Sequence, residues 1–334
     1  MIALFLSPIV APRRGGLAAA LIALAVAAPA LAKEPPREAP KAEAPKLPAT
    51  PAARARAIAQ KLPVAVNAMR ELHKAAAGIV DQPLRAAVET QLLAPWVPPE
   101  AWAYGHPREA EALLQKAGLL EGPLTLPKHG VGDFAAAPGG PCDGGHHGYP
   151  GGLAVHSWAN LLHARALAQT YRTVYGTSFN DDWLVAAALW HDSAKSQTLP
   201  FRDDGGCGPE TKIAGTPAHH IFGLTAAILR HLPSELVVVI ASAHTPPAPE
   251  HLREICGWLD AASILADGHP GSVPCPAAEP RQQRAPLEAF VNHFADADFP
   301  MTVATWGAYA AKAPAGWARY DAMLAGDAND VAAW

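Results

Sequence analysis

The segment from Asp181 to Lys195, which reads DDWLVAAALWHDSAK, constrains the fold more than any other part of this chain. Its middle, from Trp183 to Trp190, is apolar on every helical face, which is typical of a helix buried on most sides. The helix then presents His191 and Asp192 in adjacent positions. A carboxylate at the end of a buried helix costs free energy unless it is paired with a positive charge or binds a metal. Taken alone, the pair has two equally good interpretations. Either it is a functional pair, or Asp192 is solvated at the helix end and His191 is a hydrogen-bonded core residue.

Helical patterns dominate the rest of the chain, and strand-like alternation is scarce. The chain has 334 residues, half of them apolar, so it can bury a sizeable core. The spacing of apolar residues predicts helices at 52–77 (with a kink or break at Pro63), 84–93, 107–117, 153–175, 181–195, 234–243 and 249–267, and weaker ones at 286–295, 301–311 and 314–324. A further helix is expected to start at Pro217, with Thr216 as its N-cap. We therefore expect an all-α protein.

Histidine and aspartate recur on the helices that precede and follow His191 and Asp192. His156 lies near the start of the 153–175 helix, and His219 and His220 open the helix after Pro217. His244 ends the next helix, and Asp260 lies within the apolar stretch ICGWLDAASIL. Imidazole and carboxylate together suit zinc, manganese and iron. Two ions bridged by Asp192 would use more of these groups than one tetrahedral ion can.

The order H…HD…H…H…D on consecutive helices resembles the HD-domain superfamily of metal-dependent phosphohydrolases. The opening HHGYPGGLAVHS is similar to the HH-x-Y-x-GG-x-x-x-H segment of the branch that includes bacterial 3′-to-5′ exoribonucleases. The resemblance covers about residues 145–268, and the HD-x-x-K pattern makes it specific. It implies an HD-domain helical core of about five helices, with extra N-terminal and C-terminal helices.

The resemblance also implies roles for individual residues. Asp192 and Lys195 would be catalytic, with the Lys195 ammonium offsetting charge on the phosphate in the transition state. His146, His147 and His219 would bind substrate, although loop histidines such as the first two can also be simply solvent-exposed. The implied metal ligands are His156, His191, Asp192, His220, His244 and Asp260.

Four further points bear on these roles. His219 and His220 compete for one ligand position, and the spacing of the following residues favours His220. Asp267 is the alternative to Asp260. Residues 196–218 form a long insert that could act as a lid, and TPPAP follows His244 in place of a second histidine.

The N-terminus reads as a secretion signal. Residues 17–32 form an apolar stretch preceded by Arg13 and Arg14 and ending in an A-x-A cleavage motif. We expect Sec-type export to the periplasm without a stable membrane anchor, the alternatives being an uncleaved anchor or the twin-arginine route. Cleavage would remove two arginines and no carboxylate, which changes the formal charge from −4 to −6.

Composition then divides the chain into five parts. These are a signal peptide (1–32), a Pro/Ala-rich linker (33–51), an N-terminal helical segment (52–120), the metal-binding domain (121–270) and a C-terminal helical tail (271–334). Export permits disulfides between the four cysteines, for which three pairings exist. We favour Cys142–Cys207, because both lie in Gly-rich loops, and Cys256–Cys275 as the second pair.

The predicted function is that of a metal-dependent phosphohydrolase, which hydrolyses a nucleotide or other small phosphate ester through a metal-activated water. Two divalent ions (manganese, iron or zinc) are the expected cofactors. The acidic charge argues against long nucleic acids as partners. The alternatives are a di-iron oxygenase of the same fold, with a nearly identical ligand set, and a non-catalytic module that binds metal or ligand.

Overall fold

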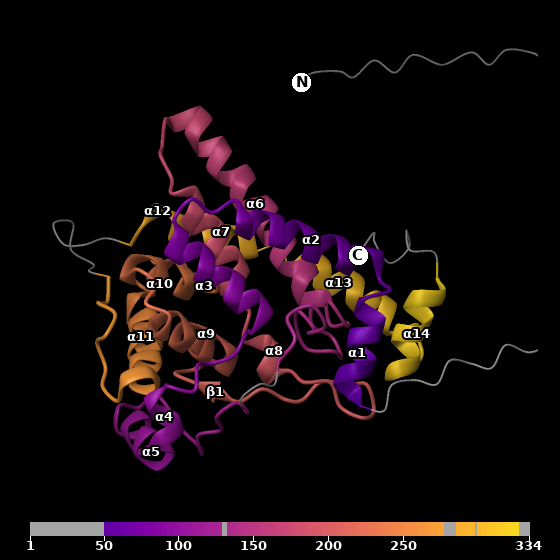
Figure 1. The fold of residues 1–334 in the computed structure, drawn as a ribbon, viewed down its shortest axis with the longest axis horizontal. Coiled ribbons are helices and arrows are strands. Elements are labelled where there is room, and N and C mark those ends of the chain that lie inside the picture. The colour runs from indigo at the N-terminus through magenta and orange to yellow at the C-terminus, as the bar shows by residue number, and fades with distance from the viewer. Residues whose placement is uncertain (1–49, 129–131, 277–284, 298, 327–334) are drawn as a thin grey trace, which may run out of the picture. The chain divides into compact units, whose positions relative to one another are not determined.

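The computed structural model describes residues 50–128, 132–276, 285–297 and 299–326. The predicted signal peptide and all but the end of the predicted linker lie outside these ranges. Residues Leu47–Trp334 form one compact unit. Helices dominate the described chain, so the prediction of an all-α fold is confirmed (Figure 1).

The elements follow one another along the chain in an order close to the predicted one. They are α1 (Pro51–Ala59), α2 (Pro63–Ala77), α3 (Gln82–Leu93), α4 (Trp102–Gly105), α5 (Pro107–Lys116), α6 (Gly152–Tyr175), α7 (Asp181–Trp190), α8 (Lys195–Thr198), β1 (Lys212–Ile213), β2 (Thr216–Pro217), α9 (Ala218–Leu229), α10 (Ser234–Ala241), α11 (Leu252–Asp267), α12 (Leu287–Asp296), α13 (Phe299–Ala310) and α14 (Trp317–Ala325).

Helix α7 lies at the centre of the helices that build the site. It begins after Asn180, whose side chain caps the first turn by accepting a hydrogen bond from the Trp183 N–H. Every residue from Leu184 to Trp190 is buried, as the apolar sequence predicts. The helix packs against α2, α3, α6, α10 and α12. These neighbours leave its C-terminal end, and the polar residues that follow, in the interior.

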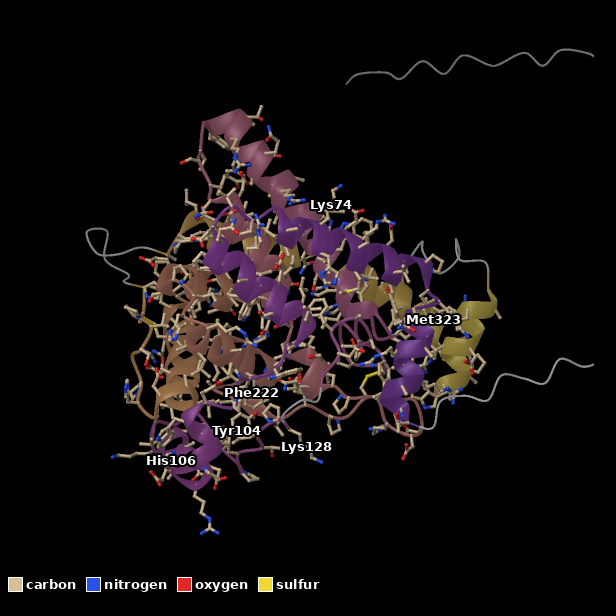
Figure 2. The ribbon with its side chains drawn as sticks, in the orientation of Figure 1. Lys74, Tyr104, His106, Lys128, Phe222 and Met323 are labelled. Atoms are coloured by element: carbon tan, nitrogen blue, oxygen red, sulfur yellow. A yellow bond between two sulfur atoms is a disulfide. The ribbon has the colours of Figure 1, made fainter. Side chains whose placement is uncertain are left out.

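The first helices pack onto this core. Pro63 breaks the expected 52–77 helix into α1 and α2, because proline donates no N–H and is favoured in the first turn of a helix. Asp182, in the first turn of α7, accepts hydrogen bonds from the backbone N–H groups of Val80 and Asp81 between α2 and α3. The side chain of Phe222 on α9 lies among the helices, whereas Lys74 on α2 is exposed (Figure 2).

The insert before α9 is ordered by two short antiparallel pairings. Strands β1 and β2 pair Ile213 with Thr216, and an isolated bridge joins Phe201 to Cys207. Pro217, not Thr216, is the N-cap of α9, so the expected capping role of Thr216 is wrong. Thr216 instead lies in β2, and its hydroxyl oxygen is 2.5 Å from Nδ1 of His220.

Two disulfides join segments of this unit. Cys142 pairs with Cys207 and Cys256 pairs with Cys275, at Cα–Cα distances of 5.4 Å and 5.2 Å. Both pairings confirm the prediction, and they are typical of proteins from oxidising compartments. Within the described residues, no helix combines the length and the apolar character that crossing a membrane would require.

Candidate metal centre

Asp192 is the residue around which the site is built. It follows α7 directly, and its side chain is fully buried. The carboxylate faces two groups of side chains, one through each oxygen. On one side His156, His191 and Asp296, and on the other Asp192 with three histidines, have possible ligand atoms that lie within 4.8 Å of one another.

The first group combines residues from α6, the end of α7 and α12. His156 Nε2 lies 3.0 Å from Asp192 Oδ2 and 3.1 Å from Asp296 Oδ1. His191 Nε2 lies 3.5 Å and 3.6 Å from the same two oxygens. These separations are close to those between neighbouring ligands of one ion held at about 2.1 Å. The four side chains are buried.

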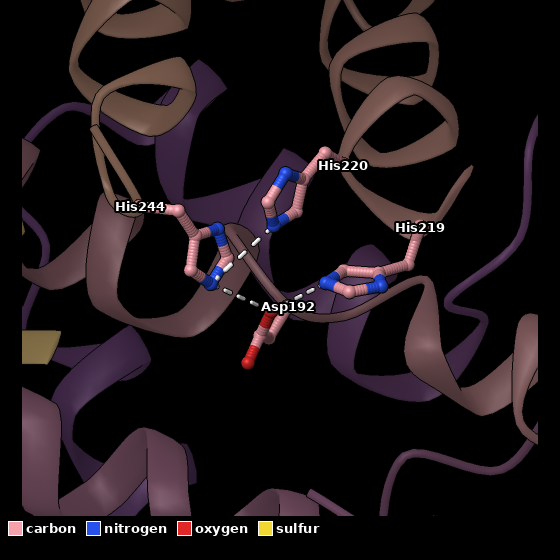
Figure 3. A group of neighbouring side chains, drawn as sticks. All are labelled: Asp192, His219, His220 and His244. Carbon is pink, nitrogen blue, oxygen red and sulfur yellow. Dashed lines mark hydrogen bonds and ion pairs between the residues drawn. The ribbon is translucent and has the colours of Figure 1, made fainter. Parts of the chain in front are cut away.

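The second group combines Asp192 with three histidines (Figure 3). His219 Nε2 lies 3.1 Å from Asp192 Oδ1, and His244 Nε2 lies 3.6 Å from the same oxygen. His220 stacks on His244, with their Nε2 atoms 3.3 Å apart. Figure 3 shows His219 and His220 reaching inward from the start of α9, and His244 from the turn after α10.

Two buried donor atoms of the second group would be satisfied by a cation between them. Asp192 Oδ1 and His219 Nε2 are both buried, and neither makes a hydrogen bond in the described part of the chain. A buried polar atom without a partner costs about 1–3 kcal/mol. A divalent cation would satisfy both atoms at once, and imidazole with carboxylate is a donor set that zinc, manganese and iron accept. The residues therefore fit a metal.

The electrostatics of the site keep both carboxylates ionised. Burial opposes the charge of Asp192, but Lys195 and His191 hold its pKa well below the usual range. Burial likewise opposes the charge of Asp296, and His244 and His156 lower its pKa. Burial would lower the pKa of His156, yet its bonds to Asp192 and Asp296 raise that pKa to about 9. Two buried negative charges thus face the histidines, with Lys195 and His156 directly beside them.

Lys195 lies where the HD-x-x-K pattern predicts, one turn after Asp192. Its side chain is buried, and the ammonium donates to Asp192 Oδ2 and, at 2.7 Å, to the Gly139 carbonyl oxygen. The charge is therefore held beside the carboxylate that both groups share. It also connects the site to the Gly-rich loop that precedes α6.

His146 and His147 lie beside the first group, on the loop before α6. With His156 they form a third group of possible ligands within 4.8 Å. The rings of His146 and His156 have centroids 4.6 Å apart. Burial lowers the pKa of His147 to about 3 and that of His146 further, so both are neutral. They can donate or accept hydrogen bonds next to the proposed metal position.

The Gly-Gly pair at the start of α6 is required by the position of His147. The His147 carbonyl oxygen accepts hydrogen bonds from the N–H groups of Gly139 and Tyr149. A Cβ on Gly152 would lie 1.9 Å from that oxygen, and Gly151 adopts a φ of 85°. Glycine is needed at both positions, for space at one and for a left-handed backbone at the other.

The structure places one expected ligand, Asp260, outside these groups. This residue is half-buried on α11 and belongs to none of the three groups. Its helix packs against α4, α5, α9 and α10, whereas α12 packs against α6 and α7. Asp296, the last residue of α12, lies in the first group with His156 and His191. Asp267, the alternative, is exposed.

The other expected residues are brought together. His156, His191, Asp192, His220 and His244 all lie in the first two groups. His219, expected to bind substrate, lies in the second group beside His220, so the two adjacent histidines do not exclude each other. Lys195 lies against Asp192, and His146 and His147 border the first group.

Three residues of the site escaped the sequence interpretation. Asp296 is the last residue of α12, and Asp192 likewise lies at the C-terminal end of a helix, α7. This shared position at a helix end could have marked Asp296 as a candidate in the sequence. Asn160, one turn after His156, donates to Asp296 Oδ1 at 2.8 Å. Glu210, in the insert, contacts His219, and nothing in its local sequence indicates that role.

Comparison with known proteins gives one similarity. The chain resembles a dihydroneopterin 2′,3′-cyclic phosphate phosphodiesterase of Methanocaldococcus jannaschii, with 28% identity over 118 residues. The match covers 34% of this chain and 45% of that relative, so it spans less than half of the relative's length. No protein-family model and no solved structure matches the chain.

Proposed function

We propose that this protein is an exported, metal-dependent phosphohydrolase acting on a small phosphate ester. The observation that carries the proposal is the placement of Asp192 between two donor sets. Its Oδ2 faces His156 at 3.0 Å, and its Oδ1 faces His219 at 3.1 Å. One carboxylate can thus bridge two ions. Two divalent ions in such a site activate a water and stabilise both the attacking and the leaving oxygen of a phosphoryl group.

Each ion would have four protein ligands. The first would be held by His156, His191, Asp192 and Asp296, and the second by Asp192, His219, His220 and His244. Manganese, iron and zinc all accept these donors. Asp192 would supply a negative charge to both ions, and Lys195 already lies against its Oδ2.

The remaining polar residues act on the substrate. Lys195 supplies a fixed positive charge next to Asp192, where it offsets the negative charge that develops on the phosphoryl oxygens. His146 and His147, neutral and close to His156, would hold the ester by hydrogen bonds.

Two observations support the proposed substrate class. The relative is named as a phosphodiesterase for a 2′,3′-cyclic phosphate, so a cyclic phosphodiester is the first compound to test. The formal charge of −4, or −6 after cleavage, gives no support to long nucleic acids, whose binding depends on cationic contacts. Water would add to phosphorus, one P–O ester bond would break, and a phosphomonoester would result. The two disulfides support an oxidising compartment.

Metal content and hydrolysis test this proposal on protein that begins at Lys33. Elemental mass spectrometry should find close to two equivalents per chain after incubation with manganese, iron or zinc. Nucleoside 2′,3′-cyclic monophosphates should then be converted to phosphomonoesters. Replacing His191 and Asp192 together with Ala should abolish both results while leaving the helical circular dichroism largely unchanged.

The contrary results are distinct. A double variant that kept its full metal content would contradict the proposed site. Two iron ions with oxygen consumption, and no hydrolysis, would favour the oxygenase alternative. Bound metal without turnover of phosphodiesters or phosphomonoesters would favour a binding module.

A further inference from the structure

Glu210 is an acidic residue of the insert that points into the metal centre. It lies just before β1, and its side chain is 13% exposed. Both carboxylate oxygens lie 2.9 Å from Nδ1 of His219. One of them also accepts the His219 backbone N–H at 2.7 Å. Side chain and backbone of the same histidine are thus held by one carboxylate.

These contacts place a proton on Nδ1 of His219. An ionised carboxylate only accepts hydrogen bonds, so Nδ1 must be the donor. A neutral His219 then has its lone pair on Nε2, and this nitrogen faces Asp192 Oδ1 at 3.1 Å. Two acceptors at that distance repel each other in a buried site. A cation between them converts the repulsion into coordination.

The other histidines of the second group lack such a partner among the described residues. His220 Nδ1 lies 2.5 Å from the hydroxyl oxygen of Thr216, which can donate or accept and therefore leaves the tautomer open. His244 contacts aspartates and histidines of the centre through Nε2. Metal-binding histidines often donate their second nitrogen to a carboxylate, which orients the ring and makes it a stronger ligand. Only Glu210 provides this in the second group as described.

We propose that Glu210 is a positioning residue that makes His219 a ligand of the second ion. It holds the ring with Nε2 toward Asp192 and keeps the proton on Nδ1. The insert that carries Glu210 thereby contributes to metal binding and is more than a cover over the site. This inference rests on the two-metal centre proposed above.

The test compares full-length mature protein, beginning at Lys33, with the variants Glu210→Leu and Glu210→Gln. Leucine removes the acceptor, and we expect the affinity for the second ion to fall about 10–100-fold, the usual effect of losing such a partner. At limiting free zinc, metal content should drop from two equivalents toward one. Glutamine keeps an acceptor oxygen without the charge, so its loss should be smaller. Asp203→Asn removes the same charge from an exposed position of the same insert and should change nothing.

Nitrogen NMR of the imidazoles in the zinc-loaded protein supplies a readout that general loosening of the fold would not produce. Wild type should show His219 protonated at Nδ1 and zinc-bound at Nε2, and Glu210→Leu should lose this signature while His156 and His191 keep theirs. Wild-type affinity for both ions in Glu210→Leu, with the His219 signature intact, would overturn the proposal. If wild type itself bound no metal, the proposed function would fail first, which separates the two conclusions.

Discussion

At the scale of single residues, the energetics of this protein centre on buried charge. Asp192 has no exposed surface, and Asp296 is nearly buried as well. Burial alone would favour the protonated form of each, yet the pKa of both carboxyls is lowered, chiefly by Lys195 and His191 for the first and by His244 and His156 for the second. Partners on four different helices or turns thus offset the desolvation of two carboxylates. Removing one carboxylate leaves imidazoles that no longer have a counter-charge.

Asp296 and Asp260 allow a direct comparison at this scale. We expect Asp296→Asn to lower the affinity for the first ion at least about 100-fold, because even partners outside the metal's own ligands are worth 10–100-fold. Hydrolysis should fall with it. Asp260→Asn should leave both unchanged, since Asp260 lies in none of the ligand groups. Metal titration monitored by elemental analysis, together with turnover of a cyclic phosphodiester, measures the difference. The reverse outcome would restore Asp260 as the ligand.

At the scale of elements, the start of α6 determines where His156 lies. The helix begins at Gly152, and His156 is in its second turn. The preceding loop folds back so that the His147 carbonyl oxygen occupies the place where a side chain at 152 would be. The start of α6, the loop before it, His147 and His156 therefore pack together as one unit. A side chain added there must displace the loop or the helix.

Gly152→Ala should therefore damage both stability and the site. Its Cβ would lie 1.9 Å from the His147 oxygen, and overpacking of this kind costs about 1–3 kcal/mol or more. Gly105→Ala is the matched control, because its Cβ would meet no atom within 4 Å, and surface changes of that type usually stay within about 0.5 kcal/mol. Urea unfolding of the two variants measures the stability difference. Equal stability would show that the loop yields easily, contrary to the packing described here.

At the scale of the whole molecule, the two disulfides differ in what they connect. Cys142–Cys207 spans 65 residues and joins the His146 loop to the insert that carries Glu210, whereas Cys256–Cys275 spans 19 residues beside α11. Cross-linking constrains the unfolded chain more when the closed loop is longer. The first bridge therefore matters more to stability, and it also lies between two segments that line the metal centre.

Removing each bridge separately should show this difference. Loop-closure entropy gives about 4 kcal/mol for Cys142→Ser with Cys207→Ser, and about 3 kcal/mol for Cys256→Ser with Cys275→Ser. We expect the first pair of substitutions also to weaken metal binding, and the second pair to leave it intact. Urea unfolding and zinc titration of the oxidised proteins check both points. Loss of metal affinity only in the second pair would contradict the assigned roles of these segments.

Much of this architecture could be predicted from local sequence. The apolar run of α7, the break at Pro63 and the pairing of cysteines in Gly-rich loops all have local physical causes, and the structure agrees with each. Five of the six expected metal ligands lie in the first two groups. The short helix α4 and the strand at Thr216 were missed, since four or fewer residues carry too little pattern.

What the sequence alone determined is the helical nature of the chain and the residue types that meet at the end of α7. An all-apolar helix must be buried, and a carboxylate at its end needs cationic partners. Only the tertiary structure decided which distant residues complete the site. Asp296 and Glu210 belong to it, and Asp260 does not, because helix packing brings α12 onto α6 and α7 while α11 lies against other helices. Local pattern specifies a side chain's chemistry, but contacts between helices far apart in sequence determine its neighbours.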